Sequence, residues 1–258
     1  MKEKKIVAII CILTSFFIAV ISLDCGIITV GKQTGNADYV LLIDPGHGGM
    51  DGGASGSDGT LEKDINLSIA KLLANEAEQY SCRVILTREQ DEWLCNTDEG
   101  SIRSRKTADL KARCEMIKQY APDLTISIHL NSFKEDPSVR GAQVFYPAGS
   151  SQADSSDVMH QCRQLAELLQ ARLNETLQHD NPRTAMTRDG VFIFKEVERP
   201  VIIVECGFLS NPSECDKLKS DEYQQNLARC IMGAIAEFAE LEKPETVEII
   251  DSLDDLTT

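Results

Sequence analysis

Two histidines in this 258-residue chain stand where a parallel sheet would place a ligand. His47 lies in a glycine-rich loop, DPGHGGMDGGA, directly after the apolar run at residues 40–43, and His129 lies near the end of a second apolar run, 124–130. A histidine beside a strand is more often structural than a ligand. However, the carboxyl ends of parallel strands meet at one edge of a sheet, where open α/β proteins bind their ligands. We therefore expect the two imidazoles to converge.

A carboxylate, Glu62, follows the glycine-rich loop at the expected start of a helix. Two imidazoles and one carboxylate, with a fourth position open, are the ligand set of a hydrolytic zinc site. The alternative role for Glu62 is a favourable interaction with the positive end of its own helix. A glycine-rich loop also serves as a phosphate cradle, but no Gly-Lys-Ser/Thr sequence follows this one, and Asp44, Asp51 and Asp58 would repel phosphate.

The fourth chemical group is Glu205, which closes the β-branched run at residues 201–204. A carboxylate is unfavourable to bury without a partner, so we expect Glu205 at the same sheet edge, acting as general acid and base. The alternative is a structural salt bridge to a nearby arginine, such as Arg199. Asp44 and Asn131 are candidates to orient the histidines by hydrogen bonds. Cys206 should point to the opposite face of the strand from Glu205 and is not expected to bind metal.

The surrounding elements follow from the hydrophobic pattern. Strands are expected at 40–43, 84–86, 124–130, 142–146, 191–194 and 201–205, and helices at 61–80, 109–120, 158–177 and 226–241. Val- and Ile-rich strands joined by helical crossovers predict one α/β domain with a mostly parallel, twisted sheet covered by helices on both faces. Three body cysteines fall on apolar helix stripes, so we interpret them as buried hydrophobic residues rather than a disulfide framework: Cys114, Cys162 and Cys230.

The ends of the chain indicate export. Three lysines within residues 2–5 precede eighteen uncharged residues, 6–23, which is long enough to span a bilayer. We favour an uncleaved membrane anchor over a cleaved signal peptide for residues 1–23, with a tether at 24–38, a catalytic domain at 39–242 and an acidic, flexible tail at 243–258. The net charge of −15 argues against nucleic-acid binding, because an acidic surface repels the phosphate backbone.

Four strings carry a family resemblance: LLIDPGHGGMDGGA, EKDINLSIA, ISIHLNS and RPVIIVECGFLSN. Together they resemble the zinc-dependent N-acetylmuramoyl-L-alanine amidases of bacterial cell walls (the Amidase_3 type), from about residue 40 to residue 241. The resemblance implies that His47, Glu62 and His129 bind Zn²⁺ and that Glu205 is the catalytic acid and base. The implied reaction is hydrolysis of the amide between the lactyl group of N-acetylmuramic acid and the L-Ala of the peptidoglycan stem peptide.

The short, single-domain form with an N-terminal anchor is similar to the sporulation and germination members of that family. This finer resemblance implies a role in spore cortex maturation, where stem peptides are removed so that muramic-δ-lactam forms. It implies an activating spore protein and a peptidoglycan deacetylase as partners, and an extracytoplasmic place between the forespore and mother-cell membranes. The alternatives are a general cell-wall remodelling or cell-separation amidase and a catalytically weak peptidoglycan-binding protein. A carbohydrate deacetylase is disfavoured because the chain has no His-x-x-x-His run.

Overall fold

The computed structural model of the chain describes residues 39–95, 100–148, 156–177 and 182–243. Six strands form one sheet in the order β2-β1-β3-β6-β4-β5. All neighbouring strands run parallel except β4 and β6, which are antiparallel. The sheet is thus mostly parallel, as the sequence predicts. The strands are β1 (Tyr39–Pro45), β2 (Cys82–Leu86), β3 (Leu124–Asn131), β4 (Gln143–Pro147), β5 (Met186–Arg188) and β6 (Val201–Phe208).

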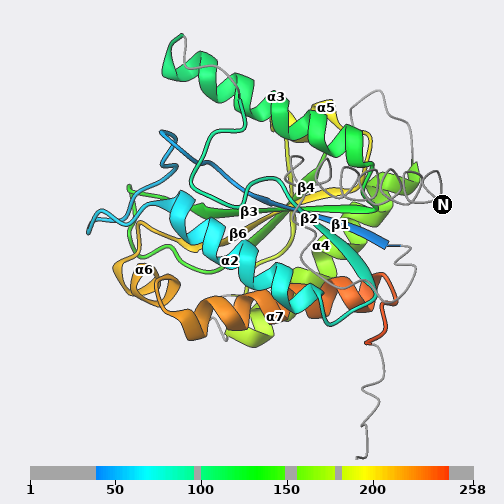
Figure 1. Ribbon diagram of the computed structural model, residues 1–258. Helices are drawn as coiled ribbons and strands as arrows, with labels where there is room; N and C mark the ends of the chain where they lie inside the picture. The colour runs from blue at the N-terminus through cyan, green and yellow to red at the C-terminus, as the bar shows by residue number, and fades with distance from the viewer. Residues whose placement is uncertain (1–38, 96–99, 149–155, 178–181, 244–258) are drawn as a thin grey trace, which may run out of the picture. The chain divides into compact units, whose positions relative to one another are not determined.

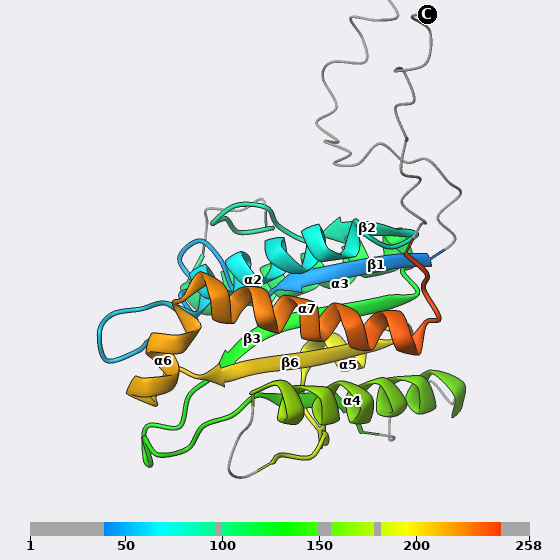
Figure 2. The same cartoon turned by 90° about the horizontal axis from the view of Figure 1, so that it is seen from below.

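Helices cover both faces of the sheet, in agreement with the predicted fold class (Figure 1). Figure 2 shows α2, α7 and α4 lying across one face, with α3 and α5 behind the sheet. A large hydrophobic core lies under α2, α4 and α7, and a smaller one lies between the sheet and α3 and α5. The helices are α2 (Glu62–Ala77), α3 (Ile102–Tyr120), α4 (Ser156–Leu177), α5 (Phe192–Glu196), α6 (Pro212–Leu218) and α7 (Asp221–Phe238).

The alternation of side chains along β6 explains how one strand serves both cores. Ile202, Val204 and Cys206 belong to the larger core, and Ile203 belongs to the smaller one. Successive residues of a strand point to opposite faces, so Glu205 shares its face with Ile203 and not with Cys206. The prediction that the Cys206 thiol points away from Glu205 is therefore confirmed.

The predicted strand at 191–194 is wrong. Residues Phe192–Glu196 form the short helix α5, and the strand β5 lies before them at Met186–Arg188. Ile193 and Phe194, which are adjacent in sequence, are both buried in the smaller core, and a helix can bury adjacent residues on one side more readily than a strand can. A run of only four apolar residues does not distinguish the two structures.

Three helices also differ from the prediction: α3, α6 and α7, the last of which begins at Asp221 and not at residue 226. α3 begins at Ile102 and not at residue 109, with the Ser101 side chain capping its first turn by accepting a hydrogen bond from the Ser104 amide. Its first two turns are mostly exposed, so no apolar period marks them in the sequence, and even Leu110 is exposed. α6 was not expected at all. Because it spans only seven residues, it is too short to produce a recognisable hydrophobic period.

All seven cysteines in the described ranges are free, and Cys114, Cys162 and Cys230 are buried as expected. No described helix is both long enough and apolar enough to cross a bilayer. The expected anchor at 1–23, the tether at 24–38 and the tail beyond residue 243 lie outside the residues that the structure describes.

Candidate metal centre

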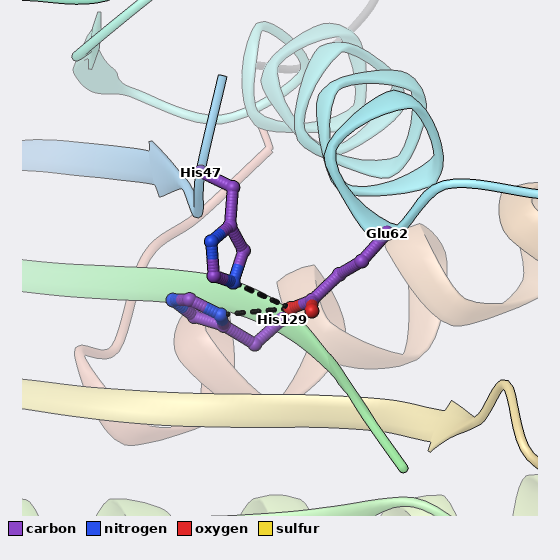
Figure 3. Close-up of side chains that lie close together, drawn as sticks. All are labelled: His47, Glu62 and His129. Atoms are coloured by element: carbon purple, nitrogen blue, oxygen red, sulfur yellow. Dashed lines mark hydrogen bonds and ion pairs between the residues drawn. The ribbon is translucent and has the colours of Figure 1, made fainter. Parts of the chain in front are cut away.

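His47, Glu62 and His129 meet at the carboxyl edge of the sheet (Figure 3). His47 follows β1, Glu62 opens α2, and His129 lies near the end of β3. One ligand atom from each side chain lies within 4.8 Å of the other two. Glu62 Oε1 is 3.1 Å from His47 Nε2 and 3.0 Å from His129 Nδ1. The predicted convergence of two imidazoles and a carboxylate is therefore a feature of the folded chain.

The glycine-rich loop makes room for this convergence. A Cβ at Gly46 would collide with the ring of His129, and a Cβ at Gly53 would lie 2.5 Å from Glu62 Oε2. His47 itself has a φ of 62°, in the left-handed region that residues with a Cβ rarely adopt. Such strain persists only where surrounding contacts over-determine the backbone, so the loop must be held firmly from outside.

Two buried arginines supply that support. Arg113 of α3 donates to the carbonyl oxygens of Pro45 (2.9 Å) and His47 (2.6 Å). Arg88 donates to the carbonyls of Pro45 and Gly46, each at 3.0 Å. Neither arginine was predicted from the sequence, because neither lies in a motif that indicates metal binding or catalysis. Their positive charges also counter the acidic groups around the loop.

Asp44 does not orient a histidine, contrary to the prediction. Its carboxylate is buried and accepts hydrogen bonds from Arg113, from Thr87 Oγ1 (2.7 Å) and from Ser127 Oγ (2.8 Å). Both oxygens of the carboxylate are thus bonded to partners on β3, on α3 and just after β2. Asp44 acts on His47 only indirectly, because it anchors the Arg113 guanidinium that holds the His47 carbonyl.

Asn131 does not orient a histidine either. Its side-chain oxygen accepts a hydrogen bond from the backbone amide of Ser132 at 2.8 Å, and its carbonyl receives the amide of Leu209. The strand register shifts between His129 and Asn131, so the simple alternation that suggested this role does not hold here.

The residue that does contact a histidine is Asp51. Asp51 Oδ2 lies 3.0 Å from His47 Nδ1, and Asp51 Oδ1 lies 2.6 Å from Lys106 Nζ of α3. A carboxylate on the far nitrogen of a ligating imidazole fixes its tautomer and raises its basicity. The spacing of four residues from His47, within the same loop, was the available signal for this role.

Glu62 is anchored independently of the histidines. Its Oε2 accepts the Ala54 amide at 2.7 Å, and its Oε1 accepts the Leu130 amide at 3.0 Å. Burial would raise the pKa of Glu62, but hydrogen bonds with His129 and His47 hold that pKa well below its usual range. The carboxylate therefore stays ionised at every physiological pH.

The protonation of His47 follows from the same contacts. Burial disfavours its charged form, but hydrogen bonds with Asp51 and Glu62 outweigh burial and raise the pKa of His47 to about 9. The two carboxylates thus favour the proton that gives His47 its positive charge. A bound metal cation would replace that proton, since a histidine ligand must be deprotonated.

Glu205 lies beside this cluster. It pairs in register with His129 across β3 and β6, so the two side chains project from the same face. Glu205 does form an ion pair with an arginine, as the structural alternative predicted. The partner is Arg188, whose Nη1 lies 2.9 Å from Glu205 Oε1, and not the exposed Arg199. Glu205 Oε2 is buried and has no hydrogen-bond partner among the described residues. A carboxylate oxygen left without a donor suits a group that must accept a proton from a ligand.

The donor set fits a divalent cation of the zinc type. Two imidazole nitrogens and one carboxylate oxygen already point at one position, and these donor types suit zinc. The orphaned oxygen of Glu205 lies on the same sheet face as His129. Such a set can polarise a carbonyl and activate water beside a general base, which is the chemistry of metal-assisted hydrolysis.

Comparison with known proteins gives one family. Residues 41–237 match the Amidase_3 model, described as N-acetylmuramoyl-L-alanine amidase. The chain is 34% identical over 201 residues to the germination-specific N-acetylmuramoyl-L-alanine amidase of Bacillus subtilis, covering 77% of this chain and 79% of that protein. It is 30% identical to the N-acetylmuramoyl-L-alanine amidase LytC of the same organism, covering 74% of this chain but only 34% of LytC.

Solved structures agree with the sequence comparison. The CwlD amidase of Clostridioides difficile, solved in complex with the GerS lipoprotein, superposes with a TM-score of 0.72 at 34% identity and covers 79% of this chain and 99% of that one. An N-acetylmuramoyl-L-alanine amidase from Clostridium difficile 630 superposes with a TM-score of 0.65 at 28% identity, covering 80% of this chain and 98% of that one. The similarity thus extends over nearly the whole described domain.

Proposed function

Because the chain belongs to the N-acetylmuramoyl-L-alanine amidase family, we propose that it hydrolyses, with zinc, the amide between the lactyl group of N-acetylmuramic acid and the L-Ala of the stem peptide. The observation that carries the proposal is the meeting of His47, Glu62 and His129 at one position beside Glu205. We assign the three clustered side chains to the metal and Glu205 to acid and base catalysis.

A zinc ion held by His47, Glu62 and His129 would lower the pKa of a water molecule to about 7 and polarise the carbonyl under attack. The protein supplies the rest of the chemistry. Glu62 contributes a permanent negative charge, held by the amides of Ala54 and Leu130. Asp51 keeps the far nitrogen of His47 occupied, so that the near nitrogen is presented to the metal.

Glu205 moves the proton in this proposal. Its Oε2 takes a proton from the attacking water as the new C–O bond forms at the lactyl carbonyl carbon. When the C–N bond breaks, the same oxygen returns the proton to the amine nitrogen of L-Ala. The products are a lactyl carboxylate and a free stem peptide. Arg188 holds Oε1, which leaves Oε2, the oxygen without a hydrogen-bond partner among the described residues, to carry the proton.

We propose spore cortex maturation as the setting, leading to muramic-δ-lactam. Support comes from the germination-specific amidase of B. subtilis, which matches over most of both chains. The alternative is general wall remodelling or cell separation. Its support is weaker, because LytC is matched over only a third of its length. A catalytically weak peptidoglycan-binding protein is the least favoured reading, since all four chemical groups are present.

The same reasoning extends to partners and location. The solved complex of a similar amidase with a lipoprotein supports an activating lipoprotein for this chain, and a peptidoglycan deacetylase would act next in the same pathway. We place the catalytic domain at 39–242 outside the cytoplasm, which suits an N-terminal anchor or signal at 1–23, a tether at 24–38 and an acidic tail at 243–258. The family match at 41–237 falls within the proposed catalytic domain.

The deciding experiment incubates the zinc-loaded chain with purified peptidoglycan and follows the release of stem peptides with free N-terminal L-Ala. Release that depends on zinc supports the proposal, and its absence with and without a co-purified lipoprotein contradicts it. For the biological setting, mass spectrometry of cortex glycan from cells lacking the protein should show loss of muramic-δ-lactam. Intact δ-lactam with defective cell separation would favour the remodelling alternative.

A further inference from the structure

Arg188 reaches the proposed catalytic carboxylate from an edge strand. It belongs to β5, all three residues of which are exposed, yet its Nη1 lies 2.9 Å from Oε1 of the buried Glu205. The two residues are separated by β4, which pairs with β5 on one side and β6 on the other. The guanidinium therefore crosses the whole width of β4 on the face that carries Glu205.

Strand register explains this reach. Gln143 of β4 pairs with Glu205, Phe145 pairs with Ile203, and Pro147 pairs with Arg188. Residues two apart on a strand share a face, so Arg188, Phe145 and Glu205 all point the same way. The guanidinium lies 4.8 Å from the centre of the Phe145 ring. Stacking on an aromatic face fixes the plane of the guanidinium and therefore the direction of its N–H groups.

Most of the hydrogen-bonding capacity of Arg188 remains unused. A guanidinium has five N–H donors, and in the described part of the chain only Nη1 donates, to Glu205. The side chain is 46% exposed, so the remaining donors are accessible from solvent. With a divalent cation at His47, Glu62 and His129, the site would also keep a net positive charge, because Arg188 and Glu205 neutralise each other.

We propose that Arg188 is a substrate-binding residue that recognises a carboxylate of the stem peptide, on the residue that follows L-Ala. This inference rests on the proposed amidase function. That residue is a D-glutamate joined to the next residue through its γ-carboxyl group. Its α-carboxyl group is therefore outside the peptide chain and available for recognition. Its Cα lies about 3.8 Å from the Cα of L-Ala. In the proposed mechanism Glu205 protonates the L-Ala nitrogen, so a guanidinium bonded to Glu205 would lie within reach of the peptide side of the scissile bond.

The test compares two soluble peptidoglycan fragments that differ only in whether this glutamate carboxyl is free or amidated. The full-length, zinc-loaded protein is assayed with each fragment. We expect KM to be roughly 10- to 100-fold lower for the free carboxylate, the range spanned by hydrogen bonds between charged groups. Equal KM values for the two fragments would overturn the proposal without any variant being made.

The variant Arg188→Met removes the charge and keeps an unbranched side chain over Phe145. We expect it to raise KM for the free carboxylate much more than for the amidated fragment. Any loss of support for Glu205 affects both fragments alike and cancels in that ratio. If the variant raises KM by the same factor for both fragments, Arg188 only positions Glu205. Arg188→Lys keeps the charge without the planar fork, so part of the discrimination should return.

Arg163→Met is the matched control. Arg163 is an exposed arginine of α4 whose Nε lies 2.8 Å from Glu167, and its loss should leave the ratio unchanged. A second readout is calorimetric binding of the dipeptide L-Ala-D-Glu, with its γ-carboxyl blocked as a methylamide and its α-carboxyl either free or amidated. We expect Arg188→Met to weaken binding only of the form with the free α-carboxylate. If the wild-type protein cleaves neither fragment, the proposed function fails. If it cleaves both with equal KM, only this inference fails.

Discussion

His129 on β3 and Glu205 on β6 are direct partners in a parallel strand pair. Their side chains therefore project from the same face at the carboxyl edge of the sheet. His129 belongs to the cluster with His47 and Glu62, and Glu205 is the neighbouring carboxylate, paired with Arg188. A shift of one residue in this register would turn Glu205 to the opposite face, where Cys206 now lies buried. The register thus sets where Glu205 lies relative to the cluster of His47, Glu62 and His129.

Replacing Glu205 with Gln should leave the metal bound and remove turnover. The amide cannot accept a proton from water, so we expect kcat to fall roughly 100- to 10,000-fold, the usual contribution of a general acid and base. Zinc content and the melting temperature serve as controls and should be unchanged. Wild-type activity in this variant would remove Glu205 from the mechanism.

The variant His129→Ala should lose the metal. It leaves only His47 and Glu62 as protein ligands, which is too few for a stable zinc site. Elemental analysis of the purified protein measures the loss directly. His160→Ala is the matched control, because His160 is an exposed residue of α4. Equal metal content in the two variants would contradict the assignment of His129.

Asp51 should contribute to metal affinity although it is not a ligand. Asp51→Asn weakens the hydrogen bond that fixes the His47 ring, and we expect the zinc affinity to fall about 10- to 100-fold. Competition with a chelator measures this change. The matched control is Asp58→Asn in the same loop, since Asp58 pairs with Lys219 at 2.6 Å and not with a histidine. An equal effect of both variants would mean that the loop charge matters and not the contact.

Arg113 should be important for stability as well as for the loop. Its guanidinium pairs with both Asp44 and Asp109 in a buried network. Arg113→Met leaves the Asp44 carboxylate buried without its cation, and removing one partner of a buried pair typically lowers the free energy of unfolding by about 3–5 kcal/mol. Urea denaturation measures the change. If Arg113→Met costs no more than the exposed control Arg163→Met, the network does not stabilise the fold.

The same network predicts how stability depends on pH. Burial alone would raise the pKa of Asp44, but Arg113, Thr87 and Ser127 hold it below the usual value of 3.8. A carboxyl group whose pKa is lower in the folded than in the unfolded state makes its full contribution to the free energy of unfolding at pH values above the unfolded pKa. Its contribution is lost as pH falls from about 4 towards the folded pKa. Urea titrations across this range should show that the free energy of unfolding declines less steeply with falling pH in Asp44→Asn than in the wild type. Equal declines in the two proteins would contradict this role of Asp44.

Much of the site was predictable because its side chains lie at places that local patterns identify. His47, His129 and Glu205 each follow or end an apolar run, and Glu62 begins a helix. Where the carboxyl ends of parallel strands lie is a consequence of the fold class. The elements that escaped prediction are those without a long hydrophobic period: the edge strand β5, the short helices α5 and α6, and the exposed start of α3.

The amino-acid order by itself determined the donor types, their attachment to strand ends and the division of β6 between two cores, because strand and helix periodicity are local properties. Only the tertiary structure decided which polar groups form hydrogen bonds and ion pairs with one another. Asp44 bonds Arg113, 69 residues away, and not a histidine, whereas Asp51 holds His47 and Arg188 holds Glu205. Such a contact forms only between side chains that lie close together in the folded chain. The packing of the helices against the sheet determines which residues distant in sequence do so.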